Sequence, residues 1–356
     1  MSEKKIELAS FQLESGILLK NIEITYHTFG TRNEKSDNII WICHALTANS
    51  NPYEWWPQIC GNQGFFNDKE HFIICANILG SCYGTTGPLS CDENGERFFD
   101  EFPLITTRDM ANLHDILRQK LKISKVHTLI GASLGGQQAL EWAIEQPSVF
   151  QNLILIATNA KHSAYGIAFN ESQRMAIEAD PTYRLKQIFG GKNGLMAARS
   201  VALLSYRTYT SYKNSQTEQD STKTTDLKAA QYQRYQGQKL ANRFNAYSYV
   251  CLTKAMDAHH VGRDRESISK ALGKITAKTL IIGITTDVLF PLSEQKELSC
   301  FIPNAVFRTI YSEFGHDGFL IEHNALMSIF KDFFINTHLE HTFRKVISFD
   351  ELLFTA

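Results

Sequence analysis

One serine in the chain stands in a pattern that nucleophilic catalysis uses. The stretch 131–135 reads G-A-S-L-G, which fits G-x-S-x-G, a sharp turn that presents Ser133 at the end of a strand. The run 126–130 before it is mostly apolar or β-branched and predicts a buried strand, and 137–144 after it carries a helical apolar face. Glycines are needed here because side chains would clash with the neighbouring strand and helix. The alternative is a glycine-rich turn in which Ser133 only caps the helix.

A serine hydroxyl becomes a good nucleophile only when a base removes its proton and a third group orients that base. Where this turn occurs, the partners follow in the order Ser, acid, His, each just beyond a strand. Asp287 follows the apolar run TLIIGITT, and His316 follows AVFRTIYSEFG, in which Gly315 permits a tight loop. Taken singly, Asp287 could be a turn residue and His316 a helix cap or a core histidine. Their order and their positions after strands instead predict a catalytic triad of Ser133, Asp287 and His316.

Acyl transfer through a serine also needs donors that stabilise the oxyanion of the tetrahedral intermediate. One donor is expected to be the backbone N–H of Leu134, directly after the nucleophile. The other comes from the loop after an earlier strand. The run IIWICHALT supplies such a strand and loop, with Leu46 as the candidate. Because the donors are backbone groups, the side chains at these two positions matter little.

These residues need a sheet that brings the ends of several strands together. Apolar and β-branched runs predict further strands at 22–29, 38–43, 72–76, 153–157, 279–284 and 306–310. A helix precedes the 126–130 strand, with these apolar residues on one face: Met110, Leu113, Leu117 and Leu121. Strands that alternate with helices indicate an α/β fold with a mostly parallel, doubly wound sheet.

The alternation of strands and helices stops between about residues 161 and 273. That segment reads as helices and polar loops, and strand-like runs resume at AKTLIIGIT. We therefore expect a core domain formed by 1–160 and 274–356, interrupted by a helical lid insertion at 161–273. The polar stretch 210–226 within the insertion predicts a flexible loop, with disorder as the alternative.

The composition is that of an ordinary globular protein of 356 residues, 43% hydrophobic and 21% charged, with a net charge of −1. This balance argues against a surface dedicated to nucleic acid or to an anionic membrane. No apolar run reaches the roughly 18 residues that span a bilayer, and the start MSEKKIELASF lacks the apolar core of a secretory signal. The seven cysteines contain no C-x-x-C pair, and Cys43, Cys75 and Cys251 have apolar neighbours that suit small core residues. We expect a reduced, cytoplasmic protein.

Together these residues resemble the homoserine O-acetyltransferase family, a branch of the α/β-hydrolase fold. The resemblance spans about residues 13–335 and rests on the blocks CHALT, ANILGSCYGTTGP, GASLGGQQALEWA, SYRT, YQGQKLANRFNAYSY, MDAHH, ITTDVLFPLSEQ and GHDGFLIEH. The family pattern implies the same triad as the residues themselves do. It further implies that Arg199, Tyr206 and Asp317 hold the amino-acid substrate.

The implied amino-acid site suits homoserine, which presents a carboxylate and an ammonium. Arg199 can bind the carboxylate through two parallel hydrogen bonds, and Asp317 can accept from the ammonium. The alternatives are a solvated helix charge for Arg199 and an N-cap of the following helix for Asp317.

The chain departs from the family pattern in two places. Ala48-Asn49 stands where Gly-Asp usually follows HALT, which concerns selectivity for the substrate and the acyl group. The nucleophile turn has Ala132 and Leu134 where Gly and Met are usual. The changes at the turn are conservative, because the oxyanion donor is a backbone group.

The resemblance implies transfer of an acetyl group from acetyl-CoA to the hydroxyl of L-homoserine by a ping-pong acyl-serine mechanism in methionine biosynthesis. It implies small-molecule substrates and a homodimer, with acetyl-CoA as co-substrate. No other cofactor is expected, and the histidine pair at 259–260 lacks the partners of a metal site.

A triad alone does not separate a transferase from a hydrolase, because water and an acceptor alcohol compete for the same acyl-serine. A transferase must exclude water and orient the acceptor, which the helical insertion would do as a lid. Within the family, a succinyl donor or a serine acceptor remains an alternative. Outside it, the rivals are an esterase or thioesterase, against which Arg199 and Asp317 argue, and a binding protein, against which the intact triad argues.

Overall fold

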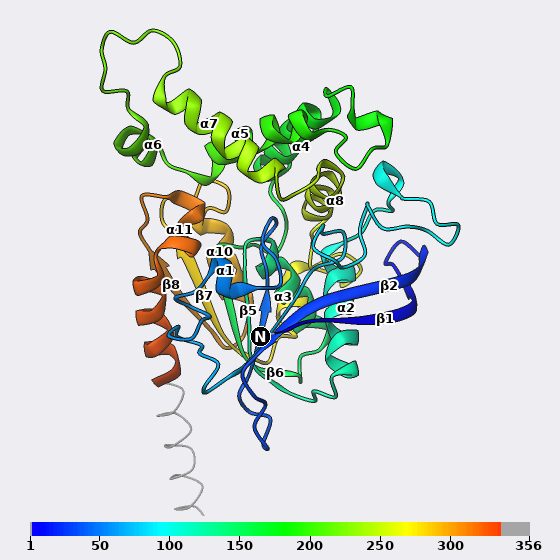
Figure 1. Cartoon of the computed structure of the whole chain (residues 1–356). Helices are drawn as coiled ribbons and strands as arrows, with labels where there is room; N and C mark the ends of the chain where they lie inside the picture. The colour runs from blue at the N-terminus through cyan, green and yellow to red at the C-terminus, as the bar shows by residue number, and fades with distance from the viewer. Residues whose placement is uncertain (1, 336–356) are drawn as a thin grey trace, which may run out of the picture.

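The computed structural model describes residues 2–335, and its centre is an eight-stranded sheet (Figure 1). The strands lie in the order β1-β2-β4-β3-β5-β6-β7-β8; β1–β2 and β2–β4 pair antiparallel, and the other neighbours pair parallel. Along the chain they are β1 Ser2–Gln12, β2 Leu18–Phe29, β3 Ile39–Cys43, β4 Phe72–Ala76, β5 Val126–Ala132, β6 Phe150–Ile156, β7 Lys278–Ile284 and β8 Ala305–Ile310. The predicted α/β class with a mostly parallel sheet is confirmed.

The central strands are buried on both faces, which explains why their sequences are almost continuously apolar. In β3, Trp41 belongs to the apolar cluster on one face, while Ile40 and Ile42 belong to the cluster on the other. In β7, Ile281 and Ile282 divide between the two clusters in the same way. Side chains that alternate between two cores hold the sheet rigid, and its strand ends therefore form a fixed platform.

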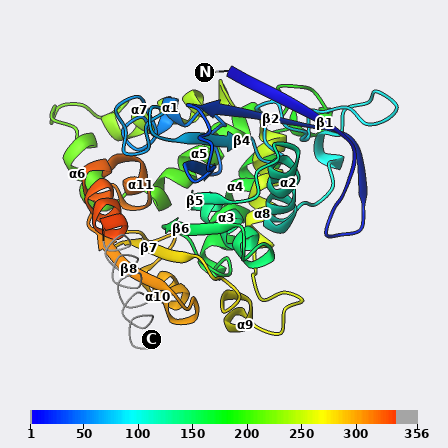
Figure 2. The ribbon, with the colours of Figure 1, turned by 90° about the horizontal axis from the view of Figure 1, so that it is seen from below.

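Helices cover both faces of the sheet (Figure 2). One face is covered by α2 (Thr107–Lys120), α3 (Leu134–Glu145) and α10 (Leu292–Phe301). The other is covered by α1 (Pro52–Trp55), α11 (Gly318–Ile321) and the helix 323–335. The start of α2 is fixed by a capping box, in which the Thr106 side chain accepts from the N–H of Asp109 and Asp109 accepts from the N–H of Thr106.

Most helices of the segment 161–273 lie above the carboxyl ends of the parallel strands (Figure 1). They are α4 (Ala164–Glu178), α5 (Lys192–Tyr206), α6 (Tyr209–Gln216), α7 (Lys228–Ala241) and α8 (Ala246–Asp257), followed by the short α9 (Ile268–Leu272). Among them, α4, α5, α7 and α8 pack against one another. The division of the chain into a core domain and a lid at 161–273 stays a prediction.

Every predicted strand is present, with bounds that differ by no more than four residues. The strand β1 was not predicted, because its sequence SEKKIELASFQ mixes charged and apolar residues and gives no clear strand signal. Its side chains are mostly exposed, and it is held by antiparallel pairing with β2, from Ser2 opposite Thr28 to Gln12 opposite Leu18. Pairing with a neighbouring strand therefore decides this element more than its own composition does.

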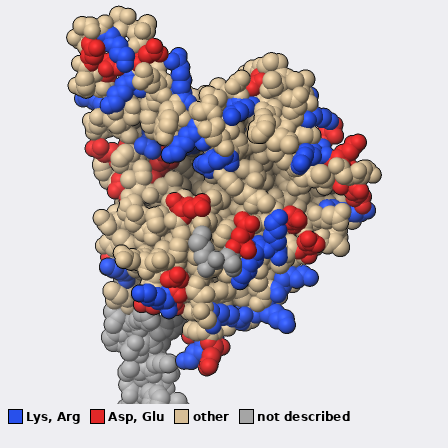
Figure 3. Space-filling model, in the orientation of Figure 1, with Lys and Arg blue, Asp and Glu red and all other residues tan. Residues whose placement is uncertain are grey.

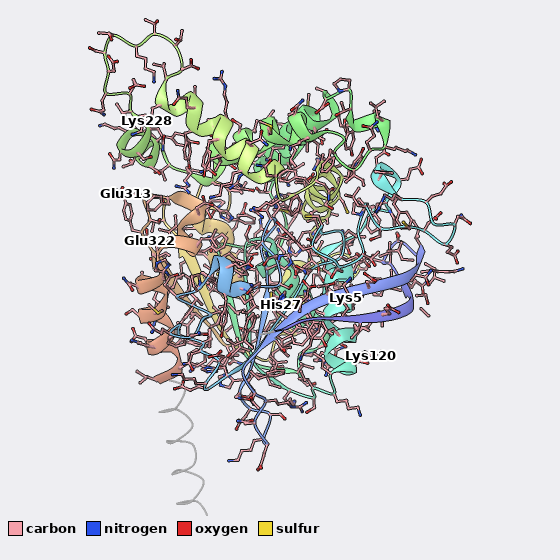
Figure 4. The ribbon with its side chains drawn as sticks, viewed as in Figure 1. Lys5, His27, Lys120, Lys228, Glu313 and Glu322 are labelled. Carbon is pink, nitrogen blue, oxygen red and sulfur yellow. The ribbon has the colours of Figure 1, made fainter. Side chains whose placement is uncertain are left out.

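The prediction of a loop across 210–226 is wrong for its first half, where α6 forms. The side chain of Thr208 caps this helix by accepting from the N–H of Ser211. The amide of Asn214 donates to the carboxylate of Glu313, which is labelled in Figure 4 beneath α6. These contacts, which a polar composition does not reveal, favour the helix. The residues 217–227 then form turns that lead to α7.

All seven cysteines are free thiols. Cys43 and Cys75 are buried in the core as predicted, and Cys251 is half-buried and packs against it. Burial raises the pKa of the Cys75 thiol well above its ordinary value. Within residues 2–335, no helix is both long and apolar enough to cross a membrane.

Candidate active site

Ser133 lies at a turn between β5 and α3 that requires glycines on either side. Its backbone angles are φ 55° and ψ −127°, a conformation that non-glycine residues rarely adopt. A Cβ on Gly131 would lie 2.2 Å from the carbonyl oxygen of Gly135, and one on Gly135 would lie 2.1 Å from that of Cys43. The predicted clash of side chains at this turn is confirmed. The Ser133 hydroxyl does not cap α3, which contradicts the alternative reading of this serine.

Ser133, His316 and Asp287 form a continuous chain of hydrogen bonds. Ser133 Oγ lies 2.9 Å from His316 Nε2, and His316 Nδ1 lies 2.6 Å from Asp287 Oδ2. With its proton on Nδ1, His316 donates to Asp287 and accepts from Ser133. The second oxygen of Asp287, Oδ1, accepts from the backbone N–H groups of Leu289 and Phe290, at 2.9 Å each. The structure thus brings the three predicted residues together, in the arrangement that activates a serine.

Aromatic rings pack on the imidazole of His316. The ring of Phe290 stacks on it with a centroid distance of 5.0 Å and an interplanar angle of 23°, and Phe319 meets it edge-on at 5.4 Å. These contacts restrict the imidazole to the orientation that reaches Ser133. Phe290 was not predicted from the sequence as a residue of the site. Its position three residues after Asp287 could have indicated it, because the Asp287 turn directs it toward the histidine.

The two backbone N–H groups expected to stabilise an oxyanion both lack an acceptor among residues 2–335. Leu134 is the first residue of α3, where an N–H has no acceptor within the helix. Leu46 lies in the turn after β3. Within the described part of the chain, neither N–H donates to a protein acceptor. The positive end of the α3 dipole adds to the attraction for a negative charge at this position.

His44 lies two residues before Leu46 and was not predicted as a site residue. Its side chain is fully buried, with Nδ1 2.9 Å from the carbonyl oxygen of Ala45 and Nε2 3.2 Å from the backbone N of Ile78. Burial lowers the pKa of His44 to about 4, so the ring is neutral at pH 7. It therefore donates through Nδ1 and accepts through Nε2. Its place in the block CHALT, one residue after a buried strand, was the available signal.

A cavity of about 570 Å³ opens over Ser133, below the helices α5 and α7. In Figure 3 the hollow lies under an upper rim on which Lys and Arg side chains gather. Six predicted residues line it: Ser133, His316, Leu46, Arg199, Tyr206 and Asp317. Asp287 and Leu134 do not line it; Asp287 lies behind His316, and Leu134 directly follows Ser133. The structure therefore gathers the catalytic and amino-acid-binding candidates around one space.

Arg199 and Tyr206 lie two turns apart on the same face of α5. The Arg199 guanidinium lies over the Tyr206 ring, with Cζ 5.3 Å from the centroid. In the part of the chain that the structure describes, Arg199 forms no salt bridge, and it is half-buried in the cavity wall. Its guanidinium is therefore oriented by a ring and remains able to bind a carboxylate.

Asp317 is engaged by an arginine that the sequence analysis did not identify. The Nε of Arg207 lies 2.8 Å from Asp317 Oδ2, and the same guanidinium lies over the ring of Phe314. Asp317 occupies the N-cap position of α11 but makes no capping hydrogen bond, which contradicts the alternative reading as a cap. Arg207 belongs to the block SYRT, directly after Tyr206, and that adjacency was the available signal.

The two residues that depart from the family pattern after HALT, Ala48 and Asn49, both line the cavity. Asn49 donates through Nδ2 to Glu54 Oε2 at 3.0 Å, and its carbonyl accepts from the indole N–H of Trp55 at 3.0 Å. These contacts make Asn49 a fixed part of the wall. No group of three or more His, Cys, Asp or Glu side chains suited to a metal occurs among residues 2–335.

Comparison with known proteins places the chain in a family. Residues 38–322 match the model of the alpha/beta hydrolase fold family. The chain is 46% identical over 330 residues to a protein named homoserine O-acetyltransferase from Cyclobacterium marinum, an alignment that covers 92% of this chain and 94% of that one.

Solved structures agree with the fold. A homoserine O-acetyltransferase from Bacillus anthracis superposes with a TM-score of 0.87 at 21% identity, covering 93% of this chain and 97% of the other. An L374D mutant of esterase E22 superposes nearly as well, with a TM-score of 0.86 at 22% identity over 93% and 99% of the two chains. At such identities the likeness concerns the fold alone, and the backbone does not separate a transferase from an esterase.

Proposed function

The chain belongs to the homoserine O-acetyltransferase family of the α/β-hydrolase fold, and we propose that it transfers the acetyl group of acetyl-CoA to the hydroxyl of L-homoserine. This is an acyl-transfer step of methionine biosynthesis. The observation that carries the proposal is the shared cavity: a hydrogen-bonded Ser133–His316 pair and the charged candidates Arg199 and Asp317 face the same space. A site built only to hydrolyse esters has no need of both charges.

In the first half-reaction, His316 Nε2 takes the proton of Ser133 as its oxygen attacks the thioester carbonyl. The oxyanion forms between the N–H groups of Leu134 and Leu46. The intermediate collapses, the carbon–sulfur bond breaks, and His316 returns the proton to the departing CoA sulfur. Asp287 stabilises the imidazolium and holds its orientation. The result is an acetyl ester on Ser133 and free CoA.

In the second half-reaction, the hydroxyl of homoserine takes the place that the thiol has left. His316 removes the hydroxyl proton, and the oxygen attacks the acetyl carbonyl of the acyl-serine. The same two N–H groups bind the second oxyanion. Collapse releases O-acetylhomoserine, and His316 returns the proton to Ser133. Because both halves use one base and one oxyanion site, the mechanism is ping-pong.

Charge recognition selects the acceptor. We assign the homoserine carboxylate to Arg199, whose planar guanidinium offers two parallel donors. The ammonium is assigned to Asp317, which keeps an oxygen, Oδ1, beyond the one that Arg207 engages. Tyr206 supports Arg199 through its ring. Water carries neither charge, so this pair favours the amino acid over hydrolysis, and the helices above the cavity limit access of water.

An esterase is the second candidate, because the hydrogen-bonded Ser133, His316 and Asp287 would also hydrolyse an acyl-serine if water took the place of homoserine. Release of CoA from acetyl-CoA, measured with and without L-homoserine, separates the two. The proposed transferase releases CoA in a burst equal to the enzyme concentration without homoserine and continuously with it. Continuous release that homoserine does not accelerate would identify a hydrolase. Succinyl-CoA and L-serine in the same assay test the donor and the acceptor.

We also propose a cytoplasmic homodimer that uses the helices of 161–273 for contact. Of the seventeen large apolar side chains exposed among the described residues, ten belong to this segment, including Phe189 at 77% and Tyr209 at 82%. Exposed apolar groups concentrated in one region favour association with another surface. Light scattering at micromolar concentration tests the dimer, and a mass equal to one chain would contradict it.

A further inference from the structure

Two positively charged side chains line the catalytic cavity and have no role in the acetyl transfer itself. Lys239, near the end of α7, and Arg243, four residues later, both line the cavity of Ser133. Both are exposed to solvent. Within residues 2–335, Lys239 forms no salt bridge, and Arg243 forms none either. The acceptor carboxylate already has Arg199 in the proposed function, so these two positive charges remain without a ligand.

Arg243 is held in place by neutral partners. Its Nη1 donates to the carbonyl oxygen of Thr47 at 2.5 Å and to the hydroxyl of Tyr83 at 2.6 Å. The remaining guanidinium nitrogens, Nε and Nη2, have no acceptor in the described part of the chain. A planar guanidinium that is fixed on one edge and open on the other can donate two parallel hydrogen bonds to two oxygens of one phosphate group.

A second cavity, of about 220 Å³, adjoins the catalytic cavity at Arg243. It shares Arg243 with the catalytic cavity, and its wall combines one further cation, Lys192, with apolar groups that include Ile188 and Phe189. Lys192 is half-buried and forms no salt bridge among residues 2–335. The catalytic cavity, with Lys239 and Arg243 in its wall, is therefore followed at Arg243 by a smaller space with apolar walls and one more cationic side chain.

This order matches the order of groups in CoA. From the thioester outward, CoA has a neutral pantetheine arm, a pyrophosphate, and an adenosine with a 3′-phosphate. We propose that Lys239 and Arg243 bind the pyrophosphate of acetyl-CoA, and that the second cavity takes the adenosine, with Lys192 on its 3′-phosphate. The proposal rests on the proposed function, because it presumes that acetyl-CoA is the donor.

The test compares three donors that share the acetyl thioester: acetyl-CoA, acetyl-dephospho-CoA, which lacks the 3′-phosphate, and S-acetylpantetheine, which lacks all phosphates. Acetylation of Ser133 is followed with each. Lys239→Gln is expected to lower the preference for acetyl-CoA over S-acetylpantetheine, the ratio of the two kcat/KM values, roughly tenfold, as for loss of one charge-assisted hydrogen bond. Lys192→Gln is expected to reduce the preference for acetyl-CoA over acetyl-dephospho-CoA.

Lys228→Gln is the matched control. Lys228 lies at the other end of α7, is exposed and does not line either cavity; Figure 4 labels it near the top of the insertion. Its removal changes the net charge equally and should leave both preferences as in the wild type. Arg243 is a poorer probe, because its bond to Thr47 also supports the loop that carries Leu46.

The outcomes separate the two proposals. If the Lys239→Gln variant keeps the wild-type preference for phosphate-bearing donors, or loses activity equally with all three, the pyrophosphate site is wrong. If the Lys192→Gln variant prefers acetyl-CoA over acetyl-dephospho-CoA as strongly as the wild type does, the assignment of the second cavity to the adenosine would be wrong. A wild-type enzyme that accepts none of the three thioesters would overturn the proposed function itself.

Discussion

The ring of His44 and the carbonyl of Ala45 are joined by a hydrogen bond of 2.9 Å, and the backbone N–H of Ala48 donates to the same oxygen at 3.0 Å. In a planar trans peptide the C=O and the following N–H point in opposite directions. Two donors that fix the Ala45 oxygen therefore also fix the N–H of Leu46, one of the proposed oxyanion donors. The ring is neutral because burial lowers the pKa of His44 to about 4, and Ile78 N–H occupies its other nitrogen.

His44→Ala is expected to lower kcat roughly 10²-fold, the size of effect seen when an oxyanion donor is lost or misplaced. KM for homoserine should change little, because the amino-acid site lies on other elements. Both half-reactions should slow alike, since both form an oxyanion at the same place. Single-turnover acetylation and a homoserine chase measure them separately. A folded variant with kcat within twofold of the wild type would refute the positioning role of His44.

Ser133→Ala is expected to lower turnover roughly 10⁴-fold or more if the serine carries the acetyl group. The fold should persist, because one oxygen is removed and alanine tolerates the same backbone angles as serine. Mass spectrometry after mixing with acetyl-CoA should show an acetyl adduct on the wild type and none on the variant. Ser172→Ala, at an exposed position on α4, serves as the control. A fully active Ser133→Ala enzyme would exclude the acyl-serine mechanism.

The fold and the triad could be predicted because both depend on short, local patterns. Central strands are buried on both faces and read as apolar runs, and the glycines around Ser133 follow from contacts within one turn. The order of Ser133, Asp287 and His316 along the chain then follows from the parallel sheet, whose strand ends meet at one edge.

The site residues that were not predicted act through contacts that a local sequence pattern does not show. Arg207 reaches Asp317 across 110 positions of sequence, and His44 reaches Ile78 across 34. Neither separation corresponds to the short repeat of side chains along a helix or a strand. For β1, the deciding contact is likewise a partner strand rather than its own composition. Tertiary pairing, unlike burial, leaves little trace in a single sequence.

Acid should destabilise the protein through its buried histidines. Burial lowers the pKa values of His44, His114 and His162 to about 4 and that of His259 to about 3, from an ordinary value of 6.5. Between pH 6.5 and about 4 the unfolded chain binds protons that the folded chain does not, so the free energy of unfolding falls as the pH falls. Each histidine contributes up to about 1.4 kcal/mol per pH unit in this window.

The urea midpoint should therefore be constant with pH above about 6.5 and decline below it. His114→Gln removes one titrating group while keeping a donor for Gln138, which His114 Nε2 contacts at 3.1 Å. As the pH falls, the free energy of unfolding of this variant should decrease less steeply than that of the wild type. The difference in slope should correspond to the uptake of about one proton fewer on unfolding. Equal slopes in the two proteins would show that His114 does not contribute.

Recognition of the acceptor's charge gives the test that best separates this enzyme from a general esterase. If Arg199 pairs with the homoserine carboxylate, Arg199→Ala removes a charge-assisted contact in a half-buried site, worth about 2 kcal/mol. That corresponds to a loss of roughly 30-fold in kcat/KM for homoserine. Acetylation by acetyl-CoA should stay close to the wild-type rate, because Arg199 has no role in the first half-reaction of the proposed mechanism.

Arg199→Lys should restore only part of this loss. An ammonium keeps the charge, but it lacks the planar pair of donors. It also stacks less well on the ring of Tyr206, whose centroid lies 5.3 Å from Cζ of Arg199. Asp317→Asn is a weaker probe, because Asp317 adjoins His316 in sequence and also pairs with Arg207, so its change disturbs two other groups. Stopped-flow acetylation followed by a homoserine chase measures the two steps on one sample. If Arg199→Ala slowed acetylation as much as transfer to homoserine, the assignment of Arg199 to the acceptor would be wrong.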